Sequence, residues 1–128
     1  MLEWKANAEG KRALMIKGAR RVGKSTIAEE FAKNEYKSYI MIDFGQVSKQ
    51  VKDLFEDLHD LNFIFLQLQM FYKVKLEARK SVIVFDEVQL APSARQAIKY
   101  LVADGRYDYI ETGSLIGIRT FTESILIP

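Results

Sequence analysis

Apolar and polar residues follow one another along this chain in blocks of two kinds. Apolar runs of strand length, several of them rich in β-branched and aromatic residues, occur at residues 13–17, 38–44, 81–85 and 107–111. Between these runs, apolar residues recur at helical spacing in a segment that starts at Lys24 and in residues 49–58, 62–79 and 93–102. We therefore predict strands that alternate with helices. This alternation indicates an α/β fold with a parallel sheet and right-handed crossovers.

Two of the predicted helices carry further signals. The only polar residues of 62–79 before Lys73 are Asn62, Gln67 and Gln69, which predicts a helix that is buried on most sides. The helix at 93–102 opens with Ser93, and Gln96 follows three residues later. This spacing is typical of a capping box, and Asp104-Gly105 provides the expected stop.

Composition excludes several classes of protein. The chain has 128 residues, of which 48% are hydrophobic and 28% charged, as expected for one globular domain. No apolar run is long enough to cross a membrane, and the first residues, MLEWKANAEGKR, lack the apolar core of a signal peptide. There is no cysteine, which excludes disulfides and cysteine-ligated metals, and His59 is the only histidine. A cytoplasmic location fits this composition.

Charge is informative locally rather than globally. The net charge of +2 gives no overall basic field of the kind that favours nucleic acid. Residues 11–28, however, contain basic residues and no acid, namely Lys11, Arg12, Lys17, Arg20, Arg21 and Lys24. Because this stretch coincides with a glycine motif, we interpret it as an anion site rather than as a solvated face.

The glycine motif is GARRVGKST, which fits the phosphate-binding pattern G-x-x-x-x-G-K-[ST] without a mismatch. Glycines let the backbone wrap closely around phosphates, and the helix that follows directs its N-terminal amides at the same oxygens. We expect Lys24 to reach the β- and γ-phosphates of ATP, Ser25 to ligate Mg²⁺, and Thr26 to lie beside the α-phosphate. We assign no chemical role to the side chains of Arg20 and Arg21. The predicted loop comprises Gly18, Ala19, Arg20, Arg21, Val22, Gly23, Lys24, Ser25 and Thr26.

A second half of the site follows the most apolar strand, in VIVFDE. Asp86 at the end of that strand suits a Walker B carboxylate, which holds Mg²⁺ through its water shell, and Glu87 is then placed to polarise the attacking water. The alternative is that the two acids merely solvate a strand end. The acid pair favours the P-loop ATPases that insert an extra strand between the P-loop strand and the Walker B strand. Numbered along the chain, the strands then lie in the order 1-4-3-2.

Polar residues also follow the fourth predicted strand, in the sequence TGS. In the order 1-4-3-2 this strand ends at the same crevice as the strands of the two motifs. Thr112 or Ser114 can therefore bind the γ-phosphate or the lytic water. A turn or a helix cap is an equally good interpretation of either residue.

These segments together resemble a known family. GARRVGKST, VIVFDEVQ, AIKYLV and YIETGS are similar to bacterial and archaeal AAA-type ATPases, within the wider group of P-loop NTPases. The similarity extends from about Trp4 to Pro128. The resemblance implies a three-layer ATPase core with ATP and Mg²⁺ as cofactors, Walker A at Gly18–Thr26, Walker B at Asp86–Glu87 and a sensor within Thr112–Ser114.

Family members usually carry a fifth strand, a small helical lid and a further C-terminal domain. We therefore expect residues 1–128 to be a truncated ATPase domain in which the fifth strand and the lid are missing. The first strand would then form an uncovered sheet edge, which favours association. We predict either that the chain self-associates along this edge or that ILIP, residues 125–128, folds back to cover part of it.

Three functions remain open at this stage. The first is an Mg²⁺-dependent ATPase that couples hydrolysis to conformational change. The second is a nucleotide-binding regulatory module with little or no turnover, which truncation favours. The third is a small-molecule phosphotransferase, which Glu87 disfavours. The sequence indicates no membrane partner, and it does not identify a protein or nucleic-acid partner.

Overall fold

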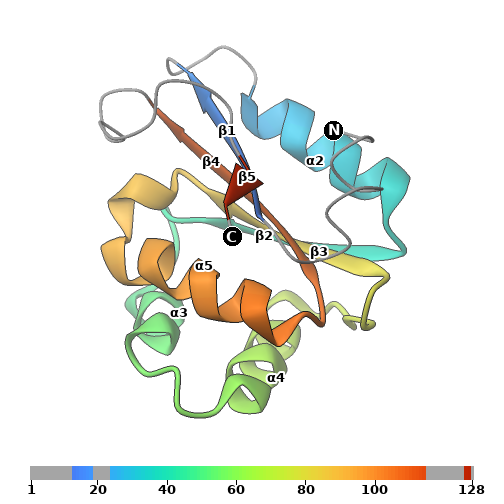
Figure 1. The fold of residues 1–128 in the computed structure, drawn as a ribbon. Coiled ribbons are helices and arrows are strands. Elements are labelled where there is room, and N and C mark those ends of the chain that lie inside the picture. The colour runs from blue at the N-terminus through green and yellow to red at the C-terminus, as the bar shows by residue number, and fades with distance from the viewer. Residues whose placement is uncertain (1–12, 19–23, 115–125, 128) are drawn as a thin grey trace.

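The computed structural model describes residues 13–18, 24–114 and 126–127, and the structural statements below concern these residues. Helices and strands alternate along most of the chain, as Figure 1 shows. In chain order the elements are β1 (Ala13–Gly18), α2 (Lys24–Glu35), β2 (Ser38–Asp43), α3 (Lys49–Asp53), η1 (Leu54–Glu56), α4 (Leu61–Tyr72), β3 (Ser81–Asp86), η2 (Val88–Leu90), α5 (Pro92–Asp104), β4 (Asp108–Ser114) and β5 (Leu126–Ile127). The helix predicted at 49–58 is thus a short α-helix continued by a 3₁₀ turn.

The described strands form one sheet in the order β2-β3-β4-β1-β5. The pairs β2–β3, β3–β4 and β4–β1 are all parallel. Read from β1, this is the predicted order 1-4-3-2, which places β4 between the strands of the two motifs. The α/β fold class and the strand order are therefore confirmed.

The expectation of a missing fifth strand was wrong. The two-residue strand β5 pairs antiparallel with β1, with Ile127 opposite Ala13 and Leu126 opposite Leu14. An edge strand offers unpaired backbone groups, and the apolar end of the chain satisfies some of them. The fold-back predicted for ILIP is thus observed at Leu126 and Ile127.

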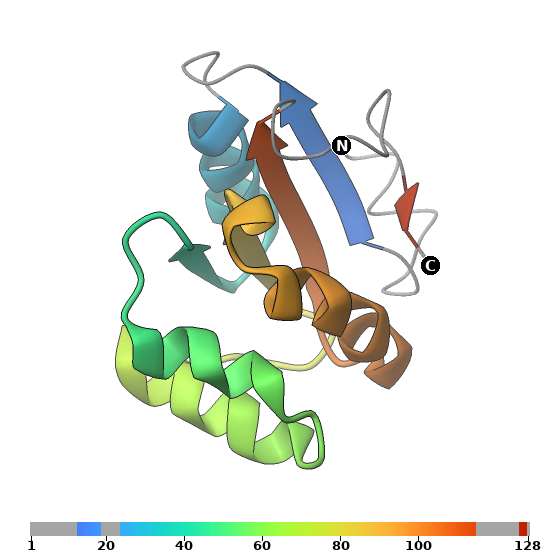
Figure 2. The same cartoon turned by 90° about the vertical axis from the view of Figure 1, so that its left-hand side faces the viewer.

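Helices cover both faces of the sheet (Figures 1 and 2). Alternate residues of β3 divide between two cores, as the pleat of a strand requires. Val82 and Val84 pack with Ala28 and Ala32 of α2. On the opposite face, Phe85 joins a larger core with residues of α3, η1, α4 and α5. All of β3 is buried, which explains its continuous apolar sequence.

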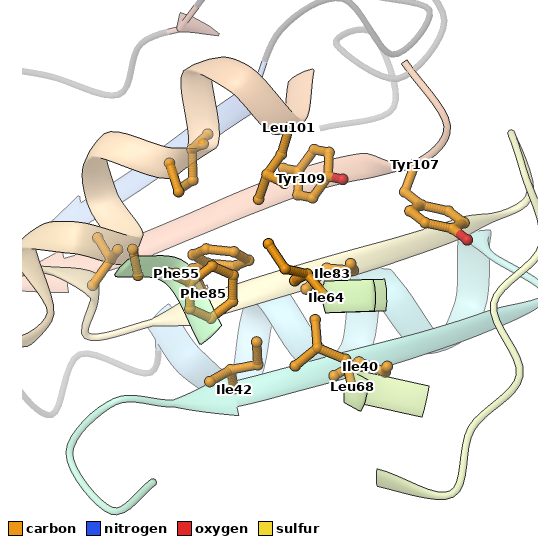
Figure 3. Close-up of a cluster of buried hydrophobic side chains, with 14 of the residues drawn as sticks. Ile40, Ile42, Phe55, Ile64, Leu68, Ile83, Phe85, Leu101, Tyr107 and Tyr109 are labelled. Carbon is orange, nitrogen blue, oxygen red and sulfur yellow. The ribbon is translucent and has the colours of Figure 1, made fainter. Parts of the chain in front are cut away.

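The larger core is held by aromatic rings (Figure 3). Phe85 of β3 packs edge-on against Phe55 of η1, with ring centroids 5.2 Å apart, and also against Tyr109 of β4. Phe65 of α4 meets Tyr107 in the same manner at 4.9 Å. Such pairs add to the free energy of burial and fix the positions of α3 to α5 on this face.

The prediction of one long helix at 62–79 was wrong in length and in burial. Lys73 adopts a left-handed conformation (φ 54°) and ends α4, and the segment after it is not helical. The Gln69 side chain holds that segment, because its Oε1 accepts a hydrogen bond from the Leu76 N–H at 2.9 Å. Only one side of α4 enters the core, through Ile64, Phe65 and Leu68. Leu61 and Tyr72 at its two ends are partly buried against the same core, and the large apolar side chains Phe63, Leu66, Met70 and Phe71 are exposed.

The predicted capping box of α5 is not formed. The helix begins one residue earlier, with Pro92 in its first turn, and its N-cap residue Ala91 has no side-chain cap. Ser93 instead donates a hydrogen bond to Glu56 at 2.9 Å. Proline suits the first helical turn because its missing N–H has no helical partner there. The predicted stop is confirmed, since Gly105 ends the helix in the left-handed conformation (φ 81°).

Among the described residues, the helices fall short of the length and apolarity that a membrane crossing requires.

Candidate functional site

The carboxyl ends of β1, β3 and β4 meet at one edge of the sheet, beside the first turn of α2 (Figure 2). β1 ends at Gly18 and α2 begins at Lys24, so the predicted phosphate loop connects these two elements. Gly18 lies directly opposite Ser114, the last residue of β4. Ligands of open parallel sheets bind at such an edge, where the strand order changes direction.

Asp86 lies at the centre of this edge. The Ser25 hydroxyl donates a hydrogen bond to Asp86 Oδ1 at 2.6 Å, and the Thr112 hydroxyl donates to the same oxygen at 2.5 Å. The strand pleat explains this meeting, because Asp86 continues the alternation of Val82 and Val84 and therefore faces α2. The two residues predicted to ligate Mg²⁺, Ser25 and Asp86, are 61 positions apart and meet here.

Glu87 is held in place through both its backbone and its side chain. Its N–H donates a hydrogen bond to Thr112 Oγ1 at 3.0 Å, and its Oε1 accepts one from Gln89 Nε2 at 2.7 Å. Its backbone is left-handed (φ 55°), a conformation that side-chain-bearing residues rarely adopt and that clusters at functional sites. This turn directs the chain away from β3 immediately after Asp86.

Thr112 joins the two acids. It is fully buried, donates its hydroxyl proton to Asp86 and accepts the backbone N–H of Glu87. Its hydroxyl therefore contacts the segment predicted as Walker B, and the γ-phosphate sensing predicted for Thr112 or Ser114 stays a prediction. Ser114 lies opposite Gly18 in the strand register.

The other predicted site residues are placed to different degrees. Thr26 is exposed in the first turn of α2. Gly18 and Lys24 are placed by their backbone, at the end of β1 and the start of α2. The remaining predicted loop residues lie outside the described part of the chain, namely Ala19, Arg20, Arg21, Val22 and Gly23.

Sequence reasoning missed a buried ion pair behind this edge. Glu111 has no exposed surface, and its Oε1 lies 3.1 Å from Nε of Arg95 in α5. Burial raises the pKa of Glu111 to about 7, and the nearby Arg95 charge offsets part of that rise. Both Glu111 oxygens are buried without a hydrogen bond among the described residues, so the contact is ionic. The sequence signal that could have revealed this pair is the position of Glu111 at the end of the apolar run YDYIE.

The pleat of β4 puts Glu111 and Thr112 on opposite faces. Ile110 belongs to the core under α2, while Tyr109 belongs to the core under α3 to α5. Thr112 follows Ile110 in the alternation and meets Asp86, whereas Glu111 follows Tyr109 and meets Arg95. Consecutive residues of β4 therefore connect the acid pair with α5.

The donor set of this edge fits magnesium. Mg²⁺ prefers oxygen ligands and binds through one or two protein groups together with phosphate oxygens and water. Ser25 and Asp86 supply a hydroxyl and a carboxylate in contact with each other. Within the described residues there is no cluster of three or more acids, histidines or cysteines that could enclose a metal alone. Ser25 and Asp86 would together supply two of the ligands that such an ion needs.

Comparison with known proteins assigns the chain to a family. A family model described as an AAA domain matches residues 10–122, a range that includes the glycine motif, the acid pair and Thr112–Ser114. A comparison with curated proteins finds no match. The match covers most of the chain and agrees with the α/β fold and with the meeting of Ser25 and Asp86. This chain therefore belongs to the AAA-type family of nucleotide-binding, ATPase-like P-loop domains.

Proposed function

We propose that this protein binds ATP together with Mg²⁺, hydrolyses it, and changes conformation with its nucleotide state. The observation that carries the proposal is the convergence of the Ser25 and Thr112 hydroxyls on one oxygen of Asp86. This convergence connects the predicted phosphate loop, the predicted Walker B strand and β4. Asp86 is almost completely buried, which supports a preorganised site over a solvated strand end.

Binding rests on the start of α2. The first N–H groups of a helix have no helical partner and carry partial positive charge, so they bind phosphate oxygens. Lys24 is the first residue of α2 and adds a full positive charge to this end of the helix. Ser25 and Asp86 would hold Mg²⁺, which neutralises charge on the phosphates when it is bound. To ligate the metal, the Ser25 hydroxyl would have to release its hydrogen bond to Asp86.

Hydrolysis is assigned to Glu87. A carboxylate polarises an attacking water by accepting its proton, and it must be held in a fixed orientation to do so. The Glu87 N–H is bound to Thr112 and its side chain to Gln89, which limits the motion of the carboxylate. Thr112 therefore serves as a positioning residue, because it holds both Asp86 and Glu87 while its own side chain is buried.

One observation favours the alternative of a regulatory module with little or no turnover. The Gln89 amide donates directly to Glu87 Oε1 at 2.7 Å, so this oxygen already has a hydrogen-bond partner within the protein. If nucleotide binding does not release it, the protein binds ATP without useful hydrolysis.

Two measurements on the same preparation separate these functions. Calorimetric titration with ATP, with and without Mg²⁺, measures binding, and phosphate release under saturating ATP measures turnover. Magnesium-dependent binding with turnover that Glu87→Gln abolishes supports the ATPase. Binding without turnover supports the regulatory module, and absence of binding contradicts both. The cytoplasmic location and the truncation of the domain remain predictions.

A further inference from the structure

Apart from Asn62, every exposed side chain of α4 is apolar. Phe63, Leu66, Met70 and Phe71 are 52%, 54%, 64% and 40% exposed. Phe63, Leu66 and Met70 follow the spacing i, i+3, i+7 and therefore form one stripe on the helix. We call these residues the α4 surface. Single exposed apolar residues are common, whereas a continuous stripe of them marks an interaction site.

The composition of α4 strengthens this interpretation. Its sequence, LNFIFLQLQMFY, contains no charged residue. The exposed side of α2, by contrast, carries Glu29, Glu30 and Lys33. A helix with one side in its own core and the other in water normally has a charged outer side. The outer side of α4 is therefore built to be covered.

Next to the α4 surface the molecule is hollowed. A hollow of about 280 Å³ is lined by Gln50, Gln67, Met70 and Phe71. A second hollow of about 210 Å³ lies at the other end of α4, and Phe63 and Gln50 are among its lining residues. Gln50 of α3 lines both hollows, which therefore adjoin along α4. Protruding side chains beside hollows are the shape that a complementary helix can fill.

Charges of opposite sign stand at the two ends of the α4 surface. Asp57 and Asp60 precede the helix, and Lys73 and Lys75 follow it, and all of them are exposed. A second α4 laid antiparallel brings the acidic end of one copy to the basic end of the other. The parallel arrangement would bring like charges together, which is unfavourable.

From the apolar stripe and this charge arrangement we infer that the α4 surface binds a second copy of the same chain, with the two α4 helices antiparallel about a twofold axis. The axis passes between Leu66 and Gln67, the middle of the stripe, so Phe63 of one copy meets Met70 of the other. One twofold operation covers both apolar stripes and pairs both charged ends. The surface is remote from the β5 edge, because α4 packs against β2 at the opposite end of the sheet.

Cysteine cross-linking tests this geometry directly, because the chain has no cysteine of its own. Under mild oxidation, Leu66→Cys should give a disulfide-linked dimer. An equimolar mixture of Phe63→Cys and Met70→Cys should also give one, while Phe63→Cys alone should not. Lys99→Cys, exposed on α5, is the matched control and should remain monomeric. Cross-linking of Phe63→Cys alone would show a parallel pair and overturn the inference, as would a mixture that does not cross-link.

Sedimentation equilibrium of the cysteine-free chain supplies the second test. The inference requires a mass that rises from monomer to dimer with concentration. Lys73→Glu should raise the dimer dissociation constant by about tenfold, because it puts like charges together. Adding Asp57→Lys should restore the parent value. A strictly monomeric parent chain, or a dimer that is indifferent to these charges, would overturn the inference.

Discussion

The guanidinium Nε of Arg95 lies 3.1 Å from Oε1 of Glu111, a carboxylate with no exposed surface. This contact attaches the first turn of α5 to β4 immediately before Thr112, the residue that holds both acids of the candidate site. α5 is therefore connected to Thr112 through consecutive residues of one strand. Because burial raises the pKa of Glu111, the protonation state of this contact changes near neutral pH.

The raised pKa of Glu111 predicts a pH-dependent stability. The folded state binds this proton more tightly than the unfolded chain, since the pKa rises from 4.5 to about 7. The contribution of Glu111 to the free energy of unfolding is therefore fully present below pH 4.5 and is lost as the pH rises through 7. The loss amounts to roughly 3 kcal/mol. Glu111→Gln cannot ionise and should flatten this part of the profile. Urea unfolding of both proteins between pH 4.5 and 8 measures the difference, and parallel profiles would contradict the prediction.

Lys24→Ala should weaken ATP binding by about 10- to 100-fold, because a charged hydrogen bond to phosphate contributes about 1.5–3 kcal/mol. The fold should persist, since Lys24 begins α2 and alanine is a good helix former. Calorimetric titration measures the affinity, and thermal unfolding is the control for stability. Lys33→Ala, on the exposed side of the same helix, should bind as the parent does. Equal affinity in Lys24→Ala would refute the phosphate-loop assignment.

Glu87→Gln should retain ATP while slowing phosphate release by at least about 100-fold, because an amide cannot accept the proton of the attacking water. Glu77→Gln is the matched control, as its partner Lys37 lies in a different part of the surface. Single-turnover phosphate release with prebound ATP measures the chemical step. Undiminished release in Glu87→Gln would move the catalytic role to another residue.

Thr112→Val and Thr112→Ser distinguish a positioning role from simple packing. Valine keeps the shape but leaves the Glu87 N–H without its acceptor and removes a donor to Asp86, which should cost about 1–3 kcal/mol of stability. It should also lower kcat, because neither acid is then held in place. Serine retains the hydroxyl and should restore most of both. If valine lowers stability but leaves kcat unchanged, Thr112 only supports the fold.

The sequence predicted the parts of the site that depend on local pattern and motif. Apolar runs located β1 to β4, and the glycine and acid motifs located Ser25 and Asp86 before their 2.6 Å contact was known. The pairing of Arg95 with Glu111 was not predictable in this way, since it depends on how α5 packs on β4.

The errors have a common physical origin. Apolar composition shows that the side of α4 carrying Leu66 is suited to burial, but it does not say whether the cover is the same chain or another molecule. The capping motif at Ser93 failed because α5 begins one residue earlier, at Pro92, so Ser93 lies inside the helix, where its hydroxyl donates to Glu56. In both cases the surrounding structure overrides a local signal.

The pairing of β5 with β1 leads to the last prediction. Leu126 lies opposite Leu14 and Ile127 opposite Ala13, so a two-residue strand shields the edge of the sheet. Leu126→Pro removes a backbone N–H and fits poorly in a paired strand, which should release β5 and expose β1. An exposed edge offers unpaired backbone groups to other chains, so we expect light scattering to rise with concentration. Leu126→Ala keeps the backbone pairing and should scatter much less.

Copies of the chain could associate through the uncovered outer side of β1 or through the α4 surface. The scattering measurement therefore needs a variant in which the α4 surface is blocked. Met70→Glu puts a charge into the apolar stripe and should prevent pairing through α4, while leaving the sheet intact because Met70 is exposed. In this background any association caused by Leu126→Pro must come from another site. Faster hydrogen exchange at Ala13 and Leu14 would identify that site as the uncovered edge. If Leu126→Pro neither associates nor exchanges faster there, β5 does not protect the sheet.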